Sequence, residues 1–182
     1  MAATMDGFWV FGYGSLIWNP GFTFEERAVG RVFGFRRALC VLSHVHRGTP
    51  ERPGLVLGLD GGGCCLGVGY RVSRSRRDET VDYLRSREQV THVYREITTS
   101  FRLNDGRRVT ALTYAVDRAH PQYAGKRRVE ELAAVARQGV GQSGRCTDYI
   151  FNTLQHLREI GIHDPELEAV AALLAQAKDG SA

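Results

Sequence analysis

The sequence has few lysines and few cysteines, and it contains no long uninterrupted hydrophobic run. Only two of its 182 residues are lysines, against 22 arginines, and 20 acidic residues leave a net charge of +4. This charge is too small, and its basic residues too scattered, to indicate a nucleic-acid-binding surface. No segment approaches the roughly 20 apolar residues of a membrane-spanning helix. We therefore expect neither a nucleic-acid partner nor a membrane partner.

The four cysteines define neither a disulfide framework nor a zinc site. Cys40, Cys64, Cys65 and Cys146 include no Cys-x-x-Cys pair, which is the usual spacing of structural zinc ligands. We therefore expect reduced thiols, a cytoplasmic location and no metal. A chain of 182 residues, 43% of them hydrophobic, buries a sufficient core without such crosslinks. We expect a single domain over residues 1–182.

Strand-like segments occupy the first two thirds of the chain, and helical patterns dominate the rest. Turn signals at residues 60–63 and 104–106 predict two hairpins, the second at Asn104-Asp105-Gly106. This order predicts an α+β fold with a mixed or antiparallel sheet, closed as a small β-barrel with surrounding helices. The expected strands are 8–11, 31–42, 55–59, 65–72, 93–103 and 107–116, and the expected helices are 79–87, 127–138, 147–160 and one from 165.

The segment Gly12-Tyr13-Gly14-Ser15-Leu16 directly follows the first predicted strand. Two glycines flanking one residue allow backbone N–H groups to converge on an anionic oxygen, such as a developing oxyanion. The alternative is a plain turn after an edge strand. Ser15 lacks the glycines two positions before and after it that a nucleophile elbow requires.

Glu88 lies where an apolar helix stripe should continue. In the helix predicted over 79–87, Val81 and Leu84 are the apolar positions, and a further step of four residues reaches Glu88. A carboxylate on such a face loses hydration, and this raises its pKa toward the range of a general acid or base. The alternative is a surface glutamate paired with Arg85, Arg87 or Arg95.

Two other motifs resemble ligand sites. Residues 139–144 read Gly-Val-Gly-Gln-Ser-Gly, the dinucleotide-binding pattern, but a helix precedes them where that motif needs a strand. We therefore interpret them as a glycine-rich connection between helices. His44 and His46 would share one face of a strand, as two metal ligands do, but no third ligand follows at standard spacing. A histidine or Arg47 lining a pocket, or making a structural hydrogen bond, is the preferred interpretation.

Together these blocks resemble the ChaC family of γ-glutamylcyclotransferases, which act on glutathione. The resemblance extends over residues 8–175 and is most specific in the first block. The matching blocks are Trp9-Val10-Phe11-Gly12-Tyr13-Gly14-Ser15-Leu16-Ile17-Trp18, His46-Arg47-Gly48, Arg52-Pro53-Gly54, Gly67-Val68-Gly69-Tyr70, Tyr83-Leu84, Arg87-Glu88, Tyr94, Ser143-Gly144-Arg145 and Tyr149.

The resemblance implies the γ-glutamylcyclotransferase-like fold and cleavage of glutathione to 5-oxoproline and cysteinylglycine. It implies that Gly12, Tyr13, Gly14, Ser15, Leu16 and Ile17 form the loop that holds the γ-glutamyl group, and that Glu88 is the catalytic acid and base. Arg47 and Tyr149 join them as expected substrate-binding residues. The reaction requires no cofactor, and we expect a monomer whose partner is this small molecule. One departure is that His92 and Val93 stand where the family usually has a glycine before the residue matching Tyr94.

Three alternative functions stay open at this point. The same cavity could serve a non-catalytic module that binds a small anion, or a cyclotransferase for another γ-glutamyl amine or dipeptide. A serine hydrolase using Ser15 as its nucleophile is the third. A product assay with glutathione and the variants Glu88→Gln and Ser15→Ala distinguish them.

Overall fold

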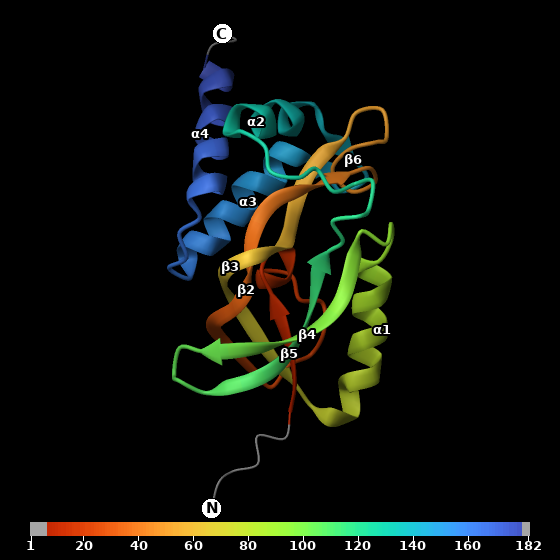
Figure 1. The fold of residues 1–182 in the computed structure, drawn as a ribbon, viewed down its shortest axis with the longest axis vertical. Helices are drawn as coiled ribbons and strands as arrows, with labels where there is room; N and C mark the ends of the chain where they lie inside the picture. The colour runs from red at the N-terminus through yellow and green to blue at the C-terminus, as the bar shows by residue number, and fades with distance from the viewer. Residues whose placement is uncertain (1–6, 180–182) are drawn as a thin grey trace, which may run out of the picture. The chain divides into compact units, whose positions relative to one another are not determined.

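A computed structural model describes residues 7–179 of the chain, with side chains through residue 176. Within these residues, no helix is both long enough and apolar enough to cross a membrane. In chain order the elements are β1 (Phe8–Gly12), η1 (Ser15–Ile17), β2 (Glu26–Ser43), β3 (Gly54–Val72), η2 (Arg74–Arg76), α1 (Arg77–Glu88), β4 (Tyr94–Leu103), β5 (Arg108–Val116), α2 (Val129–Gln138), β6 (Val140–Gly141), β7 (Gly144–Arg145), α3 (Cys146–Glu159) and α4 (Pro165–Asp179) (Figure 1).

Five strands form a closed barrel in the order β1-β3-β2-β4-β5. β1 pairs antiparallel with β3, from Phe8 opposite Val72 to Gly12 opposite Val68. The barrel closes where β1 runs parallel to β5, with Trp9 opposite Ala111. The predicted α+β class, the mixed sheet and the barrel are therefore confirmed, as is the hairpin at residues 104–106 that joins β4 to β5.

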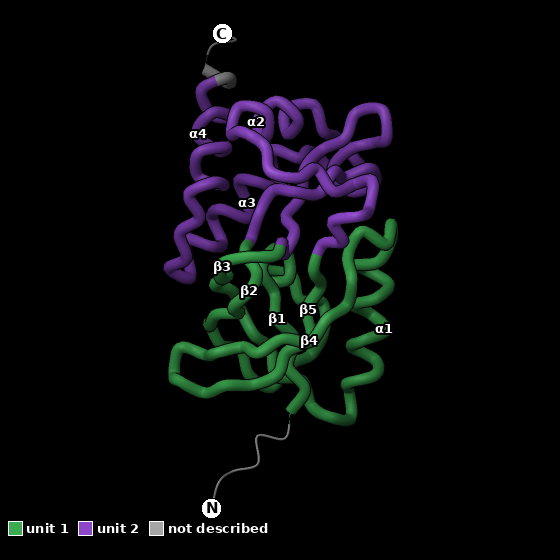
Figure 2. Tube along the Cα trace, in the orientation of Figure 1, with its two compact units in different colours: residues 1–36, 61–115 green, residues 37–60, 116–182 purple. Residues whose placement is uncertain are grey.

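The chain divides into two compact units, coloured green and purple in Figure 2. Unit 1 comprises residues 1–36 and 61–115, and unit 2 comprises residues 37–60 and 116–182. Neither unit is a continuous stretch of sequence, because β2 and β3 each contribute residues to both. The single domain expected over 1–182 stays a prediction, and residues 1–6 and 180–182 lie outside the described part.

In unit 1 the first strand is buried on both faces. On one face Phe11 packs against Phe101 with ring centroids 5.2 Å apart. On the other face Val10 belongs to the cluster that contains Val81 and Leu84 of α1. A strand covered on both sides reads as a continuous apolar run rather than an alternating one, which explains the sequence Phe8-Trp9-Val10-Phe11.

In unit 2 the helices α2, α3 and α4 pack against one another. α3 also attaches to the first half of β3 through buried hydrogen bonds. The Leu55 N–H donates to Cys146 Sγ at 3.2 Å, and the Cys146 thiol lies 3.1 Å from the Leu55 carbonyl oxygen. Burial raises the pKa of Cys146 to about 11, so this thiol stays neutral. Cys146 is therefore part of the core, as expected of a buried cysteine.

The hairpin turn predicted at residues 60–63 is wrong, because β3 runs without interruption from Gly54 to Val72. Gly62 and Gly63 adopt φ values of 102° and 78°, which produce an irregularity within the strand rather than a reversal. Asp60 is only 1% exposed and pairs with Arg118 at 2.6 Å, whereas a turn would leave it in solvent. The distant partner Arg118 thus explains why a turn-like sequence is held in a strand.

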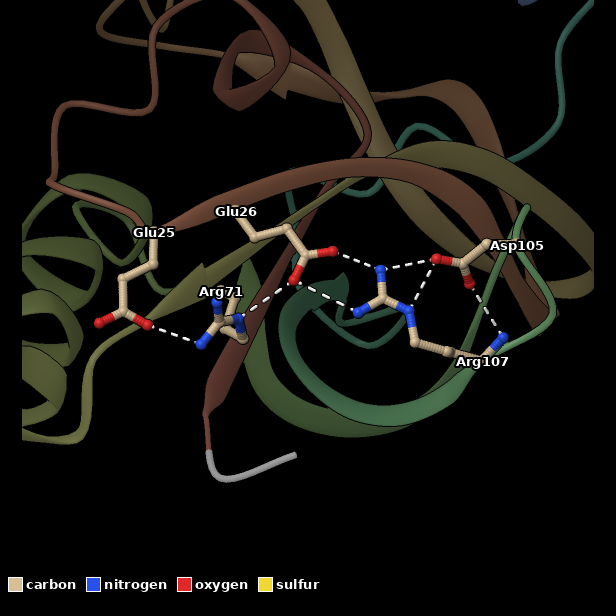
Figure 3. Close-up of polar contacts among 5 residues, drawn as sticks. All are labelled: Glu25, Glu26, Arg71, Asp105 and Arg107. Atoms are coloured by element: carbon tan, nitrogen blue, oxygen red, sulfur yellow. Dashed lines mark hydrogen bonds and ion pairs between the residues drawn. The ribbon is translucent and has the colours of Figure 1, made fainter. Parts of the chain in front are cut away.

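A chain of ion pairs links three strands at one end of the barrel (Figure 3). Glu26, at the start of β2, is bridged by Arg107 beside the β4–β5 turn and by Arg71 of β3. Arg107 also pairs with Asp105 at 2.6 Å, and Arg71 with Glu25 at 2.7 Å. Hydrogen bonds from Arg107 hold the pKa of Glu26 below its ordinary value, against the opposite effect of partial burial. The network ties strand ends together and is distinct from the residues expected to bind substrate.

Candidate active site

The loop after β1 makes a tight 3₁₀ turn. The Ile17 N–H donates to the Gly14 carbonyl at 2.9 Å, and the Asn19 N–H donates to the Ser15 carbonyl at 2.9 Å. A Cβ at Gly12 would lie 2.7 Å from the Leu16 Cβ, so the chain can fold back only over glycine. Ile17 therefore contributes a buried side chain, 4% exposed, while its N–H is used within the turn.

Side chains from distant strands hold this loop in one conformation. The Tyr70 hydroxyl of β3 lies 2.8 Å from the Leu16 carbonyl oxygen and 2.9 Å from that of Ile17. The Tyr13 hydroxyl donates to the Tyr114 carbonyl of β5 at 2.8 Å. Because these contacts are buried, losing either would leave a carbonyl without its partner. The loop is therefore a fixed element of unit 1, with Tyr13 among its anchors.

Glu88 is the last residue of α1, four residues after the buried Leu84, and it is partly buried. Its side chain is 18% exposed, and one carboxylate oxygen lies 3.3 Å from the Arg87 Nε. Burial raises the pKa of Glu88 above its ordinary value, while the charge of Arg87 opposes part of that rise. A carboxylate whose pKa is raised in this way accepts a proton more readily than an exposed glutamate does, as a general acid and base must.

Arg87 is the residue that the sequence analysis missed. Its Nη2 donates to the Ser15 Oγ at 2.8 Å, and its Nη1 donates to the Asn19 carbonyl at 2.6 Å. From the sequence, Arg87 was considered only as one of three surface partners for Glu88. Its position three residues after Leu84, on the same side of the helix as Glu88, could have indicated that Arg87 also faces the loop. Ser15 is thus paired with a guanidinium, which cannot accept its proton; this disfavours a serine nucleophile.

Arg47 and Tyr149 belong to unit 2, where they contact each other. The Arg47 guanidinium lies over the Tyr149 ring, 5.4 Å from its centroid. The Tyr149 hydroxyl accepts a hydrogen bond from the Leu57 N–H at 3.2 Å, and the residue is 7% exposed. Arg47 also donates to the Arg145 carbonyl at 3.2 Å. This pair therefore has a packing role within unit 2, and its role in substrate binding stays a prediction.

The histidine pair is not on a strand, contrary to the expectation. His44 and His46 follow the end of β2 in a bend, because the segment turns to run beside the β6–β7 hairpin. The His46 Nδ1 lies 3.0 Å from the Ser143 Oγ. The hairpin spans residues 140–145, between α2 and α3, so the glycine-rich residues 139–144 are a connection between helices, as expected. In the described part of the chain, no three His, Cys, Asp or Glu residues are grouped to hold a metal ion.

A pocket of about 320 Å³ lies beside α1 in unit 1, but it does not include Glu88 or the loop. Its lining is mostly charged and includes Arg85 of α1 and Glu96 of β4. These two form a double hydrogen bond, at 2.8 Å on each side, and Glu96 also accepts from the Tyr114 hydroxyl at 3.1 Å. Arg85 and Glu96, two of the charged groups that line the pocket, are therefore already paired with each other.

His92 has a φ of 59°, the left-handed conformation that side chains other than glycine rarely adopt. It lies in the short loop between Glu88 and β4, at one of the two positions where the family usually has glycine. A non-glycine residue held there costs about 1–3 kcal/mol. Replacing His92 by glycine recovers only part of this free energy, because glycine is more flexible in the unfolded chain and loses more entropy on folding.

We expect His92→Gly to raise the free energy of unfolding by about 1 kcal/mol, because it relieves this strain. Urea denaturation measures the change. The neighbouring Val93→Gly serves as the control and should be destabilising, since Val93 is 2% exposed and packs in the core. A His92→Gly protein less stable than the wild type would contradict the prediction.

Comparison with known proteins assigns the chain to a family. The family model described as "ChaC-like protein" matches residues 8–177. The glutathione-specific γ-glutamylcyclotransferase of Escherichia coli (strain K12) is 35% identical over 172 residues, which covers 92% of this chain and 74% of the relative. Glutathione-specific γ-glutamylcyclotransferase 1 of Danio rerio is 33% identical over 182 residues, which covers 96% of this chain and 93% of the relative.

A solved structure shows the same fold. The crystal structure of a yeast γ-glutamyl cyclotransferase specific to glutathione matches with a TM-score of 0.86 at 23% identity. The match covers 94% of this chain and 96% of the yeast chain. The barrel with its helices is therefore the γ-glutamylcyclotransferase-like fold, and the chain belongs to the ChaC-like family.

Proposed function

We propose that this protein is a γ-glutamylcyclotransferase that cleaves glutathione to 5-oxoproline and cysteinylglycine. The observation that carries the proposal is a largely buried carboxylate, Glu88, whose pKa is raised by burial and which one guanidinium connects to the loop of residues 12–17. The names of the curated relatives, glutathione-specific γ-glutamylcyclotransferases in bacteria and animals, support the same substrate.

The proposed reaction is an intramolecular aminolysis. The α-amino nitrogen of the γ-glutamyl group attacks its own γ-carbonyl carbon, and the carbon–nitrogen bond to the cysteinyl amine breaks. The attacking nitrogen starts as an ammonium and gives up two protons to become the lactam N–H. The departing amide nitrogen gains two and leaves as an ammonium. Atoms, electrons and protons therefore balance without water, metal or redox cofactor.

Glu88 would move these protons. Its ionised carboxylate takes one proton from the α-ammonium, so that the nitrogen can attack, and delivers it to the departing amide nitrogen. Ionised again, it takes the second proton from the new ring nitrogen and passes it to the released amine. The raised pKa suits both steps, because the carboxylate must gain and lose a proton at similar pH. The rest of the rate acceleration comes from holding the flexible γ-glutamyl chain in a reactive conformation, since nucleophile and electrophile belong to one molecule.

The loop of residues 12–17 would hold the γ-glutamyl group. We assign the backbone N–H groups of Tyr13 to Leu16 to the substrate or to the oxyanion that forms at the γ-carbonyl. The Ser15 hydroxyl, fixed by Arg87 at 2.8 Å, can still donate its own hydrogen to the glutamyl head. Arg47 and Tyr149 remain candidate substrate-binding residues from their family-matching blocks.

The decisive test is incubation of the protein with glutathione. We expect 5-oxoproline and cysteinylglycine in equal amounts, measured by mass spectrometry. γ-Glutamylalanine serves as the comparator, because it offers the same γ-glutamyl group without the cysteinylglycine portion, and we expect slower turnover. Turnover of that dipeptide alone would assign another γ-glutamyl substrate, and saturable glutathione binding without products would assign a binding module.

We also propose that the protein acts in the cytoplasm as a monomer, without nucleic-acid or membrane partners. Cys64 presents a thiol at the surface, and this suits a reducing compartment. The substrate is a small molecule, as it is for the relatives named above.

A further inference from the structure

Arg87 contacts both parts of the site proposed above. Its Nε faces a Glu88 carboxylate oxygen at 3.3 Å, and its Nη2 faces the Ser15 Oγ at 2.8 Å. Its Nη1 donates to the Asn19 carbonyl at 2.6 Å and to the Tyr83 hydroxyl at 3.1 Å. A guanidinium holds its five N–H donors in one rigid plane. A single rigid guanidinium therefore contacts both the Glu88 carboxylate and the loop.

The neighbouring Arg85 shows that this arrangement is not general to the end of α1. The Arg85 side chain is 52% exposed and forms its double hydrogen bond with Glu96. The Arg87 side chain is only 20% exposed and faces the loop. The negative end of the helix dipole stabilises the charge of both arginines, so the dipole does not distinguish Arg85 from Arg87. They differ in the groups that they contact, and Arg85 therefore serves as a control for Arg87.

We propose that Arg87 is a positioning residue, which fixes the Glu88 carboxylate relative to the loop that holds the γ-glutamyl group. The proposal rests on the function proposed above. Arg87 itself needs no contact with the substrate, because it acts through Glu88, Ser15 and the Asn19 carbonyl. A displacement of about 1 Å in a reacting group can lower a rate about 100-fold.

The charge of Arg87 has a second, separable effect. It stabilises the ionised form of Glu88 and so opposes the rise in pKa that burial causes. Tyr114 of β5 also lies close enough to Glu88 to interact with its charge, and the Tyr114 hydroxyl donates to Glu96 of β4. Burial together with these carboxylates raises the pKa of Tyr114, so it stays neutral. Arg87 is thus the positive charge next to Glu88 on α1.

Two substitutions of Arg87 separate its effect on the position of the Glu88 carboxylate from the effect of its charge. Arg87→Gln removes both, and we expect kcat/KM for glutathione to fall about 100-fold, with the acid limb of its pH profile moved to higher pH. Arg87→Lys keeps a charge but lacks the planar fork, so we expect the pH midpoint to stay near that of the wild type while kcat falls. Arg85→Gln should change kcat/KM less than about twofold, as expected for an exposed ion pair.

A measurement without turnover tests the same proposal. Carbon-13 NMR of protein labelled at glutamate carboxyls, with Glu88 assigned through Glu88→Gln, follows the Glu88 titration directly. We expect the Glu88 pKa to rise in Arg87→Gln and to change little in Arg85→Gln. Absence of turnover in the wild type would overturn the proposed function, whereas this titration still tests Arg87.

The outcomes that overturn the role of Arg87 are specific. Wild-type kcat/KM and an unmoved pH midpoint in Arg87→Gln would exclude it. A loss of activity that follows a fall in melting temperature, with the Glu88 titration unchanged, would assign Arg87 to folding alone. Melting temperatures measured by circular dichroism for all three variants distinguish that case.

Discussion

Glu88→Gln is expected to lower kcat for the release of 5-oxoproline by about 10²- to 10⁴-fold, the range that general acid–base catalysis contributes. The amide keeps the size of the side chain but cannot take the α-ammonium proton. KM should change little, because the loop of residues 12–17 is anchored by Tyr70, Tyr13 and Arg87 rather than by Glu88. Steady-state kinetics with glutathione measures both values.

The matched control for this variant is Asp82→Asn, an equivalent change on the exposed side of the same helix. It should retain wild-type kcat within about twofold, since surface substitutions away from special features have small effects. Undiminished activity in Glu88→Gln would remove Glu88 from its proposed role.

The stability of Glu88→Gln provides an independent check, because its sign follows from the pKa shift. Burial raises the pKa of Glu88 in the folded state above its unfolded value. The wild type therefore loses stability as the pH rises from the unfolded pKa through the folded one. Glu88→Gln should match the wild type in strong acid and be more stable at neutral pH. An inactive but stabilised variant would show that the activity was not lost through misfolding.

Leu84→Ala is expected to lower the free energy of unfolding by about 2–5 kcal/mol, the range for a fully buried leucine. Leu84 is 0% exposed and packs in the cluster of Val10, Leu16 and Leu112, so its removal leaves a cavity between α1 and the barrel. The melting temperature should fall by roughly 5–15 °C. Thermal and urea denaturation measure these changes.

Val90→Ala is the control for Leu84→Ala, because Val90 follows the same helix but is 52% exposed. Its effect should stay within about 0.5 kcal/mol. At a temperature where Leu84→Ala is still folded, we also expect reduced turnover, since Leu16 of the loop loses a packing partner. Equal stability of the two variants would mean that the Leu84 cluster is not part of the cooperative core.

The sequence predicted those features that depend on nearby residues. The strand of residues 8–11, the β4–β5 hairpin and the partly buried position of Glu88 each follow from spacing within about ten residues. Features that depend on distant partners were missed. Whether residues 60–63 turn or continue depends on Arg118, which pairs with Asp60 from 58 positions away. Arg87 reads as a surface charge until the fold places Ser15 beside it, 72 positions away in sequence.

The parallel pairing of β1 with β5 has a consequence for how the protein is made. β1 is synthesised before β5, and its partners Ala111 and Leu112 follow about a hundred residues later. The groups that hold the loop, at Tyr70, Arg87 and Tyr114, also lie 53 to 101 positions downstream. Contacts between such distant residues slow folding, because a long loop must close before they form. On the ribosome, the proposed substrate loop therefore emerges before the segments that hold it and becomes ordered only after they have been made.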